Sequence, residues 1–387
     1  SLLGFFKYFN FFIDSWIDLL GAFGYEHQST WTLKVILPVG ISFYTFQTMS
    51  YSLDIYFKKL KPTKDFISFA SFVSFFPQLV AGPIERASNL LPQILNKRVF
   101  NYEQGIQGLR LILWGMFKKV VIADSLAWRV DFVFNNYQNL DGGILILGLI
   151  YFSIQIYCDF SGYSDIAIGT SKLFGFEVMS NFKFPYFSRN MGEFWKRWHI
   201  SLSSWFRDYL YIPLGGSKVG TFLSIRNIFI IFILSGLWHG ANLKFIMWGL
   251  IHAMLYIPLF LKKHHNKYNM KIVAEDQKFP KLKELFLIGK TFMLTTITWT
   301  FFRSENINSA FEYIFRIVAE IKFPESNLSG VPLILILFSI DWSFRVSERE
   351  VLNVKYFVLR YLVYLIISLS IILNFLNKNR EFIYFQF

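Results

Sequence analysis

Long apolar runs recur along the whole chain and are separated by short polar segments. A helix that crosses a bilayer needs about 20 mainly apolar residues. The pattern therefore predicts a series of membrane-spanning helices rather than the half-polar helices of a water-soluble protein. The clearest runs are 32–53, 66–84, 144–168, 226–238, 243–261, 284–302 and 354–376, and weaker or partial runs are 1–20, 108–126 and 331–346.

Some of these runs are not simple spans. Residues 226–261 are apolar for longer than one helix requires, and the run is interrupted at residues 239–242. Residues 108–126 carry Lys118 and Lys119 near their middle. Irregular backbone at membrane depth is stable only where protein or a water-filled cavity surrounds it. We therefore expect an all-α polytopic membrane protein, a bundle of about eight to ten helices with broken or re-entrant segments and short interfacial helices.

The segment 190–208 differs from these runs because it is short and carries charges. Asn190 followed by Glu193 is typical of a helix N-terminus, where the asparagine caps the helix and the glutamate reaches back. The helical period predicts an interfacial helix that turns His199 toward the protein interior. Its apolar face would carry Trp195, His199, Leu202 and Phe206, and its polar face Arg197, Ser201, Ser204 and Asp208.

The composition agrees with a membrane location. Of the 387 residues, 54% are hydrophobic and only 17% are charged, whereas an average soluble domain is about 25% charged. No hydrophilic block is long enough to form a soluble domain, so we interpret residues 1–387 as a single membrane-embedded domain. The single cysteine, Cys158, excludes an internal disulfide and a cysteine-based zinc cluster.

The net charge of +13 comes from lysines and arginines that gather in short loops between the apolar runs. Cytoplasmic loops of membrane proteins are rich in these residues. The best cytoplasmic candidates are the loops 58–64 and 262–283, and we expect His264 and His265 in the second loop to be solvated. No basic stripe is interleaved with exposed aromatic residues, so nucleic acid is not an expected partner.

Two histidines lie in apolar, tryptophan-rich surroundings, His239 in LSGLWHGAN and His199 in FWKRWHISL. A polar group at membrane depth is costly and indicates a functional site. Because burial disfavours the imidazolium ion, such a ring stays uncharged and can accept a proton. The alternative is a core histidine held by a neighbouring carbonyl or, for His199, an interfacial residue anchored by Trp195. We interpret His252 as a core histidine.

Further polar residues interrupt the apolar run YFSIQIYCDFSGYSDIAIG, among them Gln155, Asp159 and Asp165. Carboxylates at membrane depth mark either a substrate path or an ion pair. Both interpretations remain open: hydrogen bonding between helices, or the wall of a polar funnel. In FFPQLVAGPIERA, Glu85 and Arg86 are expected to shape a helix break.

The basic residues Lys196, Arg207 and Lys218 suggest an entrance for a phosphate-bearing donor such as coenzyme A. A solvated face or one that binds lipid headgroups fits them equally well. Neither His199 nor His239 has the short spacing to a second ligand that zinc sites show, so no metal site is expected. No G-x-S-x-G elbow occurs, which leaves histidine as the leading candidate for acid–base chemistry.

Three long motifs, YCDFSGYSDIAIG, NFKFPYFSRNMGEFWKRWHISLSSWFRDYLYIPLGG and LSGLWHGANLKFIMWG, together resemble the membrane-bound O-acyltransferase (MBOAT) superfamily. The segment FVSFFPQLVAGPIERA and the C-terminal FIYFQF are similar to its bacterial AlgI-like branch, which acts in alginate O-acetylation. Relatives of that branch act on peptidoglycan and teichoic acid. Such proteins normally have further membrane segments ahead of the point where this chain begins. We therefore expect the chain to lack its N-terminal membrane segments.

The resemblance implies an O-acyltransferase, an acetyltransferase in this branch, in which His239 occupies the position of the essential histidine. It places His199 at the position of a second polar residue upstream. We expect His239 to take the acceptor's proton or to carry the acyl group, and His199 to orient the donor or stabilise the oxyanion. Supporting or substrate-path roles are expected for Trp238, Asn242, Asp159, Asp165, Gln155, Trp195 and Arg197.

The resemblance also implies the partners and the location. The acyl donor would be acetyl-CoA or an acyl carrier on the cytoplasmic side, with no tightly bound cofactor. The acceptor would be an exported polysaccharide, an alginate-like exopolysaccharide or peptidoglycan, reached through an extracytoplasmic SGNH-type or AlgJ-like acetyltransferase. The expected location is the bacterial inner membrane, in contact with lipid.

Three other functions remain open at this point: D-alanyl transfer to teichoic acid, transport or flipping of a lipid-linked glycan, and a scaffold that only recruits a secretory partner. Many transporters contain structural repeats, and the sequence shows none. A flippase or a scaffold should also tolerate the loss of His239 better than an enzyme.

Overall fold

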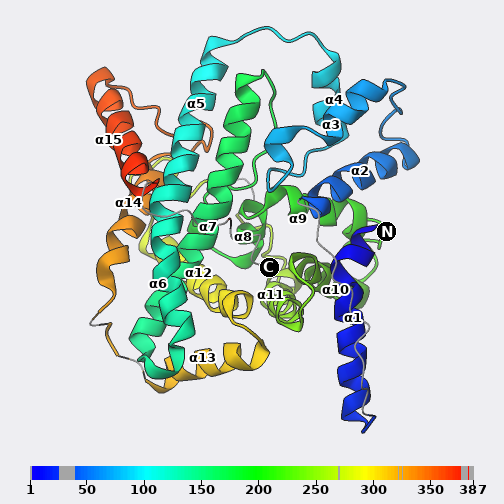
Figure 1. The fold of residues 1–387 in the computed structure, drawn as a ribbon, viewed down its shortest axis with the longest axis vertical. Helices are drawn as coiled ribbons and strands as arrows, with labels where there is room; N and C mark the ends of the chain where they lie inside the picture. The colour runs from blue at the N-terminus through cyan, green and yellow to red at the C-terminus, as the bar shows by residue number, and fades with distance from the viewer. Residues whose placement is uncertain are drawn as a thin grey trace.

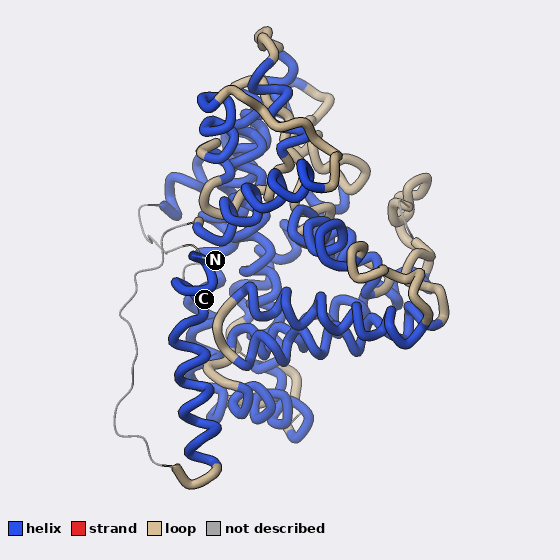
Figure 2. Tube along the Cα trace, turned by 90° about the vertical axis from the view of Figure 1, so that its right-hand side faces the viewer, coloured by secondary structure: helices blue, strands red, loops and turns tan. Residues whose placement is uncertain are grey.

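The computed structural model describes residues 2–25, 40–268, 271–320, 322–324, 326–375 and 382. This part of the chain consists of helices joined by loops and contains no strand (Figure 2). The α-helices in chain order (Figure 1) are α1 (Leu2–Ala22), α2 (Ile41–Tyr56), α3 (Phe66–Val73), α4 (Ala87–Leu95), α5 (Tyr102–Met116), α6 (Asp124–Asn135), α7 (Gly142–Leu173), α8 (Met191–Arg197), α9 (Ile200–Phe206), α10 (Thr221–His239), α11 (Leu243–Leu261), α12 (Leu282–Arg303), α13 (Ile307–Ala319), α14 (Val331–Ser343) and α15 (Phe357–Phe375).

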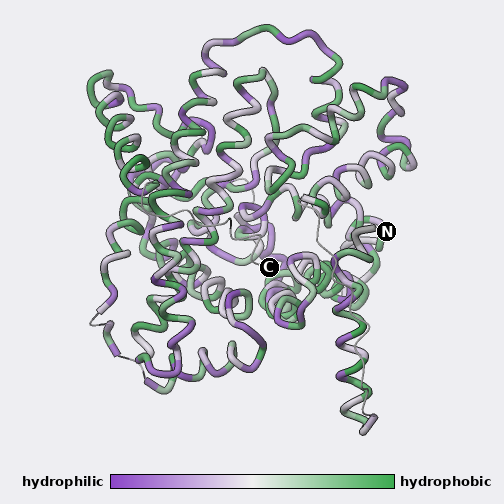
Figure 3. Tube along the Cα trace, viewed as in Figure 1, coloured by the Kyte–Doolittle hydropathy of each residue, from purple (hydrophilic) through white to green (hydrophobic). Residues whose placement is uncertain are grey.

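Five of these helices, α7, α10, α11, α12 and α15, are long and apolar enough to cross a membrane. Figure 3 shows the hydrophobic colour concentrated on such helices and the hydrophilic colour on the connecting loops. The α3 region and α14 are shorter apolar helices. The prediction of an all-α, multi-pass membrane protein with broken segments and short helices is therefore confirmed.

Two predicted spans differ from the observed helices. Residues 66–84 do not form one span, because α3 ends at Val73 and only a short 3-10 turn, Phe76–Gln78, follows before the loop that leads to α4. Pro77 cannot donate a helical hydrogen bond, which explains the break. The run 32–53 contributes its second half to α2, and its residues 32–39 lie outside the described part of the chain.

The predicted interfacial helix over 190–208 is also wrong as a single element. Asn190 does cap a helix, since its side chain accepts a hydrogen bond from the backbone N–H of Glu193 at 2.8 Å. The helix stops at Arg197, however, and a second one starts at Ile200. Between them His199 adopts the left-handed region, with φ of 44°. The chain therefore turns sharply at the histidine itself.

Helix α5 continues through a π-helical segment, Phe117–Ala123, directly into α6, and α7 packs along this whole run. Glycines make the close approach possible. A Cβ added at Gly115 would lie 2.5 Å from the carbonyl oxygen of Gly162, and one added at Gly108 would lie 2.6 Å from that of Gly169. Small residues at such spacing let two membrane helices pack backbone to backbone.

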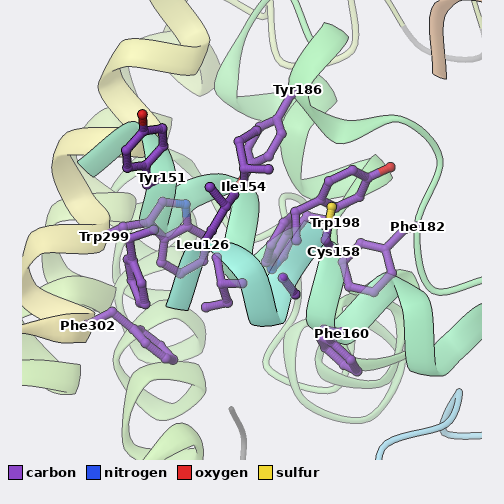
Figure 4. Packing of buried hydrophobic residues seen from close by; sticks show 14 of the residues in the cluster. Leu126, Tyr151, Ile154, Cys158, Phe160, Phe182, Tyr186, Trp198, Trp299 and Phe302 are labelled. Carbon is purple, nitrogen blue, oxygen red and sulfur yellow. The ribbon is translucent and has the colours of Figure 1, made fainter. Parts of the chain in front are cut away.

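Helices α10 and α11 pack against each other as a hairpin and are seen nearly end-on in Figure 1, where α7 runs upright. Helix α12 packs against both α11 and α7 and so connects the hairpin to the rest of the bundle. The core at this junction is aromatic. Trp198, Trp248, Trp299 and Phe302 are fully buried there, and Figure 4 shows Trp299 and Phe302 next to each other on α12.

We predict that Gly115→Val destabilises the protein, because the added side chain has to enter the space that the backbone of α7 occupies. Overpacking of this kind costs about 1–3 kcal/mol. Thermal unfolding of the detergent-solubilised protein would show the loss as a lower melting temperature. Gly289→Val on α12 is the matched control, since a Cβ at Gly289 meets nothing within 4 Å. Equal melting temperatures for the two variants would contradict the prediction.

Candidate active site

His239 is the last residue of α10, at the tip of the α10–α11 hairpin. Asn242 caps the next helix by accepting a hydrogen bond from the backbone N–H of Lys244 at 3.0 Å. The space beside Gly240 is filled by the aromatic ring of Phe245, so no substrate can approach the backbone there. A Cβ at Gly240 would lie 2.2 Å from the ring of Phe245. The glycine is therefore required for packing of the hairpin.

The imidazole of His239 is buried, with 7% of the residue exposed, inside a cage of aromatic rings. Its ring centre lies 4.9 Å from that of Trp238, 5.3 Å from Trp248 and 5.1 Å from Phe302. All three rings meet the imidazole edge to face. Such a cage excludes water and fixes the ring in one orientation, which a catalytic base requires.

His199 is buried even more completely, with 1% exposed. Its ring packs edge to face against Phe160 at 4.7 Å and against Trp238 at 5.8 Å. Neither ring nitrogen has a hydrogen-bond partner among the described residues. His199 lies outside the five candidate spans, and burial lowers its pKa to about 3. A non-glycine residue with positive φ and an unsatisfied buried side chain is typical of a functional position.

Trp238 brings the two histidines together. Its ring contacts both imidazoles, one on each side of the α10 terminus, although 40 positions of sequence separate them. Phe46 of α2 stacks on the same indole at 5.8 Å. His199 and His239 therefore belong to one buried site, in which Trp238 is the shared wall.

His252 lies at the edge of the same aromatic cluster and has a hydrogen-bond partner at one ring nitrogen, while its Nδ1 has none among the described residues. Its Nε2 is 2.9 Å from Oγ1 of Thr298, and its ring contacts Trp248 at 4.7 Å and Trp195 at 4.9 Å. This geometry agrees with a core histidine. Trp195 on α8 contacts Trp248, which in turn contacts His239. It therefore supports the aromatic cluster without touching His239 itself.

The intramembrane carboxylates pair with lysines of the neighbouring helix. Nζ of Lys118 lies 2.7 Å from Oδ2 of Asp165, and Nζ of Lys119 lies 2.7 Å from Oδ1 of Asp159. Of the two interpretations of these residues, the structure supports contact between helices rather than the wall of a funnel. Gln155, one turn before Asp159 on α7, has a side-chain oxygen with no hydrogen-bond partner among the described residues.

Arg197 is held by hydrogen bonds to a carboxylate and to two backbone carbonyls. Its guanidinium donates to Oε1 of Glu193 at 2.8 Å and to the backbone carbonyls of Lys183 and Lys271. Arg189 binds the same Glu193 carboxylate from the other side, with both partners buried. These bonds hold α8 against the loop that follows α11, so Arg197 has a structural role.

A pocket of about 420 Å³ opens between α8, α9, α10 and α11. We call it the α8–α11 pocket; its wall includes Trp195, Lys196, Ile200, Ser203, Phe206, Arg207, Ser217, Phe232, Ser235, Tyr256, Phe260, His265 and Asn266. Lys196 and Arg207 thus share one wall, as the predicted basic entrance requires, whereas Lys218 is not part of it. His265 lines this pocket instead of being fully solvated, which corrects the prediction for that residue.

The α8–α11 pocket approaches the histidines along two elements. Ser235 lies one turn before His239 on α10, and Ile200 directly follows His199. The lining is mainly apolar and also includes the basic side chains of Lys196 and Arg207. The pocket can therefore hold a mainly apolar chain that carries a charged group.

A second, more polar pocket of about 630 Å³ lies near the start of α11 and the end of α12. We call it the α6–α13 pocket; it is lined by Phe134, Asn135, Tyr137, Gln138, Lys244, Arg303, Ser304, Glu305 and Ser309. Arg303 directly follows Phe302, a ring of the cage around His239. Neither His199 nor His239 is among the lining residues of the two pockets, but each pocket contains a residue close in sequence to the site.

The described residues contain no group of three or more His, Cys, Asp or Glu side chains that could hold a metal ion.

The site residues that the sequence did not single out are mainly aromatic. Trp248, Phe302, Phe160 and Phe46 build the site around the histidines. Phe160 and Phe302 are both labelled in Figure 4, where each belongs to the packed core. Aromatic residues make up 20% of this chain, so their types alone could not reveal which ones form the cage.

A multi-pass helical bundle with two histidines buried around one tryptophan belongs to the class of polytopic membrane proteins with a buried polar site. The chain is a member of the membrane-bound O-acyltransferase (MBOAT) family, whose model matches residues 3–272. The matched region includes α7, the α10–α11 hairpin and both histidines. The predicted resemblance is therefore confirmed.

Three relatives illustrate the breadth of the family. The chain is 44% identical over 311 residues to "Probable alginate O-acetylase AlgI" of Pseudomonas putida, a match that covers 80% of this chain and 61% of the relative. It is 35% identical over 411 residues to "Peptidoglycan O-acetyltransferase" of Helicobacter pylori, with coverage of 99% and 73%. It is 30% identical over 249 residues to "Teichoic acid D-alanyltransferase" of Bacillus subtilis, with coverage of 61% and 62%. The chain thus spans less than two thirds of the length of the AlgI relative.

We predict that the free energy of unfolding falls less steeply on acidification in His199→Gln than in the wild type. The folded-state pKa of His199 is about 3 and the unfolded value is about 6.5, so the unfolded chain binds a proton first as the pH falls. The contribution of His199 to the free energy of unfolding is complete above pH 6.5, and it decreases by about 1.4 kcal/mol per pH unit below that value. Melting temperatures measured between pH 7.5 and 5 test the slope.

Glutamine carries no proton in that range, so the melting temperature of the variant should fall less steeply than that of the wild type. His264→Gln, on an exposed loop, is the control and should retain the wild-type slope. An unchanged slope in His199→Gln would show that His199 is protonated as easily in the folded protein as in the unfolded chain.

Proposed function

We propose that this chain is the catalytic part of a membrane O-acetyltransferase that moves an acetyl group from a cytoplasmic thioester to a hydroxyl of an exported polysaccharide. The observation that carries the proposal is the pair of buried histidines around Trp238. Two pockets include residues that neighbour this site in sequence, Ser235 and Ile200 in one and Arg303 in the other. The names of the Pseudomonas and Helicobacter relatives support O-acetylation as the reaction.

The sidedness follows from the order of the helices and the positive-inside rule. The lysine-rich segments 58–64 and 262–283 follow α2 and α11. If α11 ends in the cytoplasm, α10 begins there and the tip of the hairpin at 240–242 faces outward. Lys196, Arg207 and Asn266 then place the mouth of the α8–α11 pocket inside. The α6–α13 pocket, lined by residues at the start of α11 and the end of α12, faces outward.

This arrangement suits transfer across the membrane. The apolar depth of the α8–α11 pocket would hold the pantetheine arm and acetyl group of acetyl-CoA, with the phosphates near Lys196 and Arg207. The α6–α13 pocket would admit the acceptor, since amide and hydroxyl side chains such as Asn135, Gln138 and Ser309 suit polar groups. Neither substrate would have to cross the bilayer.

The chemistry needs a base and a hydrogen-bond donor. The uncharged imidazole of His239 takes the proton of the acceptor hydroxyl while the oxygen attacks the thioester carbon. His199, whose nitrogens have no other described partner, donates its single N–H to the developing oxyanion. Collapse of the intermediate breaks the C–S bond, and His239 returns the proton to the thiolate. One ester and one thiol result.

The location and the partner form part of the same proposal. A donor thioester made in the cytoplasm and an exported acceptor place the protein in the bacterial inner membrane. The hydroxyl that His239 activates would then belong to a serine or tyrosine of an SGNH-type, AlgJ-like acetyltransferase outside the membrane, which would pass the acetyl group on to the polysaccharide. The alternative of a transporter rested partly on Asp159 and Asp165 as parts of a substrate path. It loses that support because these carboxylates pair with Lys119 and Lys118.

The direct test is base-labile acetate on the cell-envelope polysaccharides of cells that express the full-length protein. We expect His239→Ala, at matched membrane abundance, to reduce released acetate to the level of a deletion strain, because no other described base takes its place. His264→Ala in the exposed loop is the control and should retain wild-type acetate. Wild-type acetate in His239→Ala would instead favour a transporter or a scaffold.

The α8–α11 pocket makes a separate prediction. Ser235→Phe places a ring in the pocket one turn from His239 and should reduce transfer about tenfold or more by blocking the donor. Leu234→Phe, whose side chain is 39% exposed on the outer side of α10, is the matched control and should be active. Vesicle assays with radiolabelled acetyl-CoA measure both. Full activity in Ser235→Phe would mean that the donor binds elsewhere.

A further inference from the structure

The end of α10 is capped by a different helix. The last carbonyls of a helix have no partner within it, and Gly240 is extended, with φ of −170°, so α10 lacks the left-handed turn that usually satisfies them. Nζ of Lys7 on α1 donates to the carbonyl of Trp238 at 2.5 Å and to that of His239 at 3.5 Å. Tyr8 donates its hydroxyl to the carbonyl of Leu237 at 3.1 Å.

Lys7 occupies an unusual place for a lysine. It is only partly exposed within the apolar helix α1, and no carboxylate among the described residues pairs with it. The ammonium also lies 5.6 Å from the centre of the Trp238 ring, the wall shared by His199 and His239. A charge held by backbone carbonyls in apolar surroundings is costly and indicates a purpose.

We propose that Lys7 is a positioning residue for His239, an inference that rests on the proposed acyl transfer. Its hydrogen bonds fix the backbone carbonyls of Trp238 and His239. They therefore hold the imidazole against Trp248 and Phe302. Its charge also offsets the partial negative charge at the end of α10, which otherwise favours an imidazolium ion and removes the base. The titratable groups that surround His239 are Lys7 from α1, which binds its carbonyl, His199, which meets it across Trp238, and His252, which meets it across Trp248.

The test compares Lys7→Met, Lys7→Arg and Tyr8→Phe in the full-length protein, in membrane vesicles supplied with radiolabelled acetyl-CoA. Lys7→Met retains the length of the side chain but not its charge, and we expect kcat to fall about tenfold or more with the KM for acetyl-CoA within about twofold. Lys7→Arg should recover most of the activity. Tyr8→Phe should have a smaller effect, because its bond is one residue further from His239. Asp18→Asn, an exposed position on the same helix, is the control.

The pH profile separates positioning from general support of the fold. Without the ammonium the imidazolium forms more readily, so the acid limb of the Lys7→Met rate profile should move to higher pH. A purely structural role would lower the rate by the same factor at every pH and would reduce the melting temperature and membrane abundance in parallel.

The outcomes also distinguish this inference from the proposed function. If His239→Ala is inactive and Lys7→Met transfers acetate like the wild type, the positioning role is wrong and the proposed function is retained. A pH-independent loss in Lys7→Met that Lys7→Arg does not recover likewise overturns the positioning role. If His239→Ala retains wild-type transfer, the proposed function fails and the role of Lys7 fails with it.

Discussion

The hydrogen-bonding groups of a backbone that breaks at membrane depth need partners within the protein, because the bilayer supplies none. The α10–α11 hairpin meets this requirement at the position where His239 lies. Asn242 caps the start of α11, while Lys7 and Tyr8 cap the end of α10 from a helix more than 200 residues away in sequence. The break therefore exposes an imidazole to the interior without leaving the neighbouring carbonyls of α10 unsatisfied.

The same constraint explains the charged residues on the longest helices. Lys118 and Lys119 occupy the π-helical segment between α5 and α6, and each faces a carboxylate of α7. A buried ion pair is weak evidence for stability, because desolvation opposes the attraction. Removing only one member of such a pair would nevertheless leave an uncompensated charge. These pairs therefore fix the register of α7 against α5, where glycines already bring the two backbones into contact.

The candidate site depends on how this rigid frame surrounds two buried histidines with aromatic rings. The two histidines are in contact with one tryptophan, and most rings around them come from different helices: Phe46 from α2, Phe160 from α7, Trp248 from α11 and Phe302 from α12. Two pockets of different polarity approach this cluster. The proposed transfer from a donor on one side of the membrane to an acceptor on the other would use this arrangement, since the reacting groups could meet while the substrates stay in their own compartments.

The sequence by itself determined the class of the protein, most of its spanning helices, the break at residues 239–242 and the two histidines, because membrane burial selects for long apolar runs and makes polar exceptions conspicuous. Only the tertiary structure decided what those exceptions contact. It paired Asp159 and Asp165 with lysines, tied Arg197 to Glu193 and divided the segment 190–208 at His199. It also placed Lys7 at the end of α10. Such contacts join residues far apart in the chain, and local periodicity reports which face of a helix is apolar but not which helix will cover it.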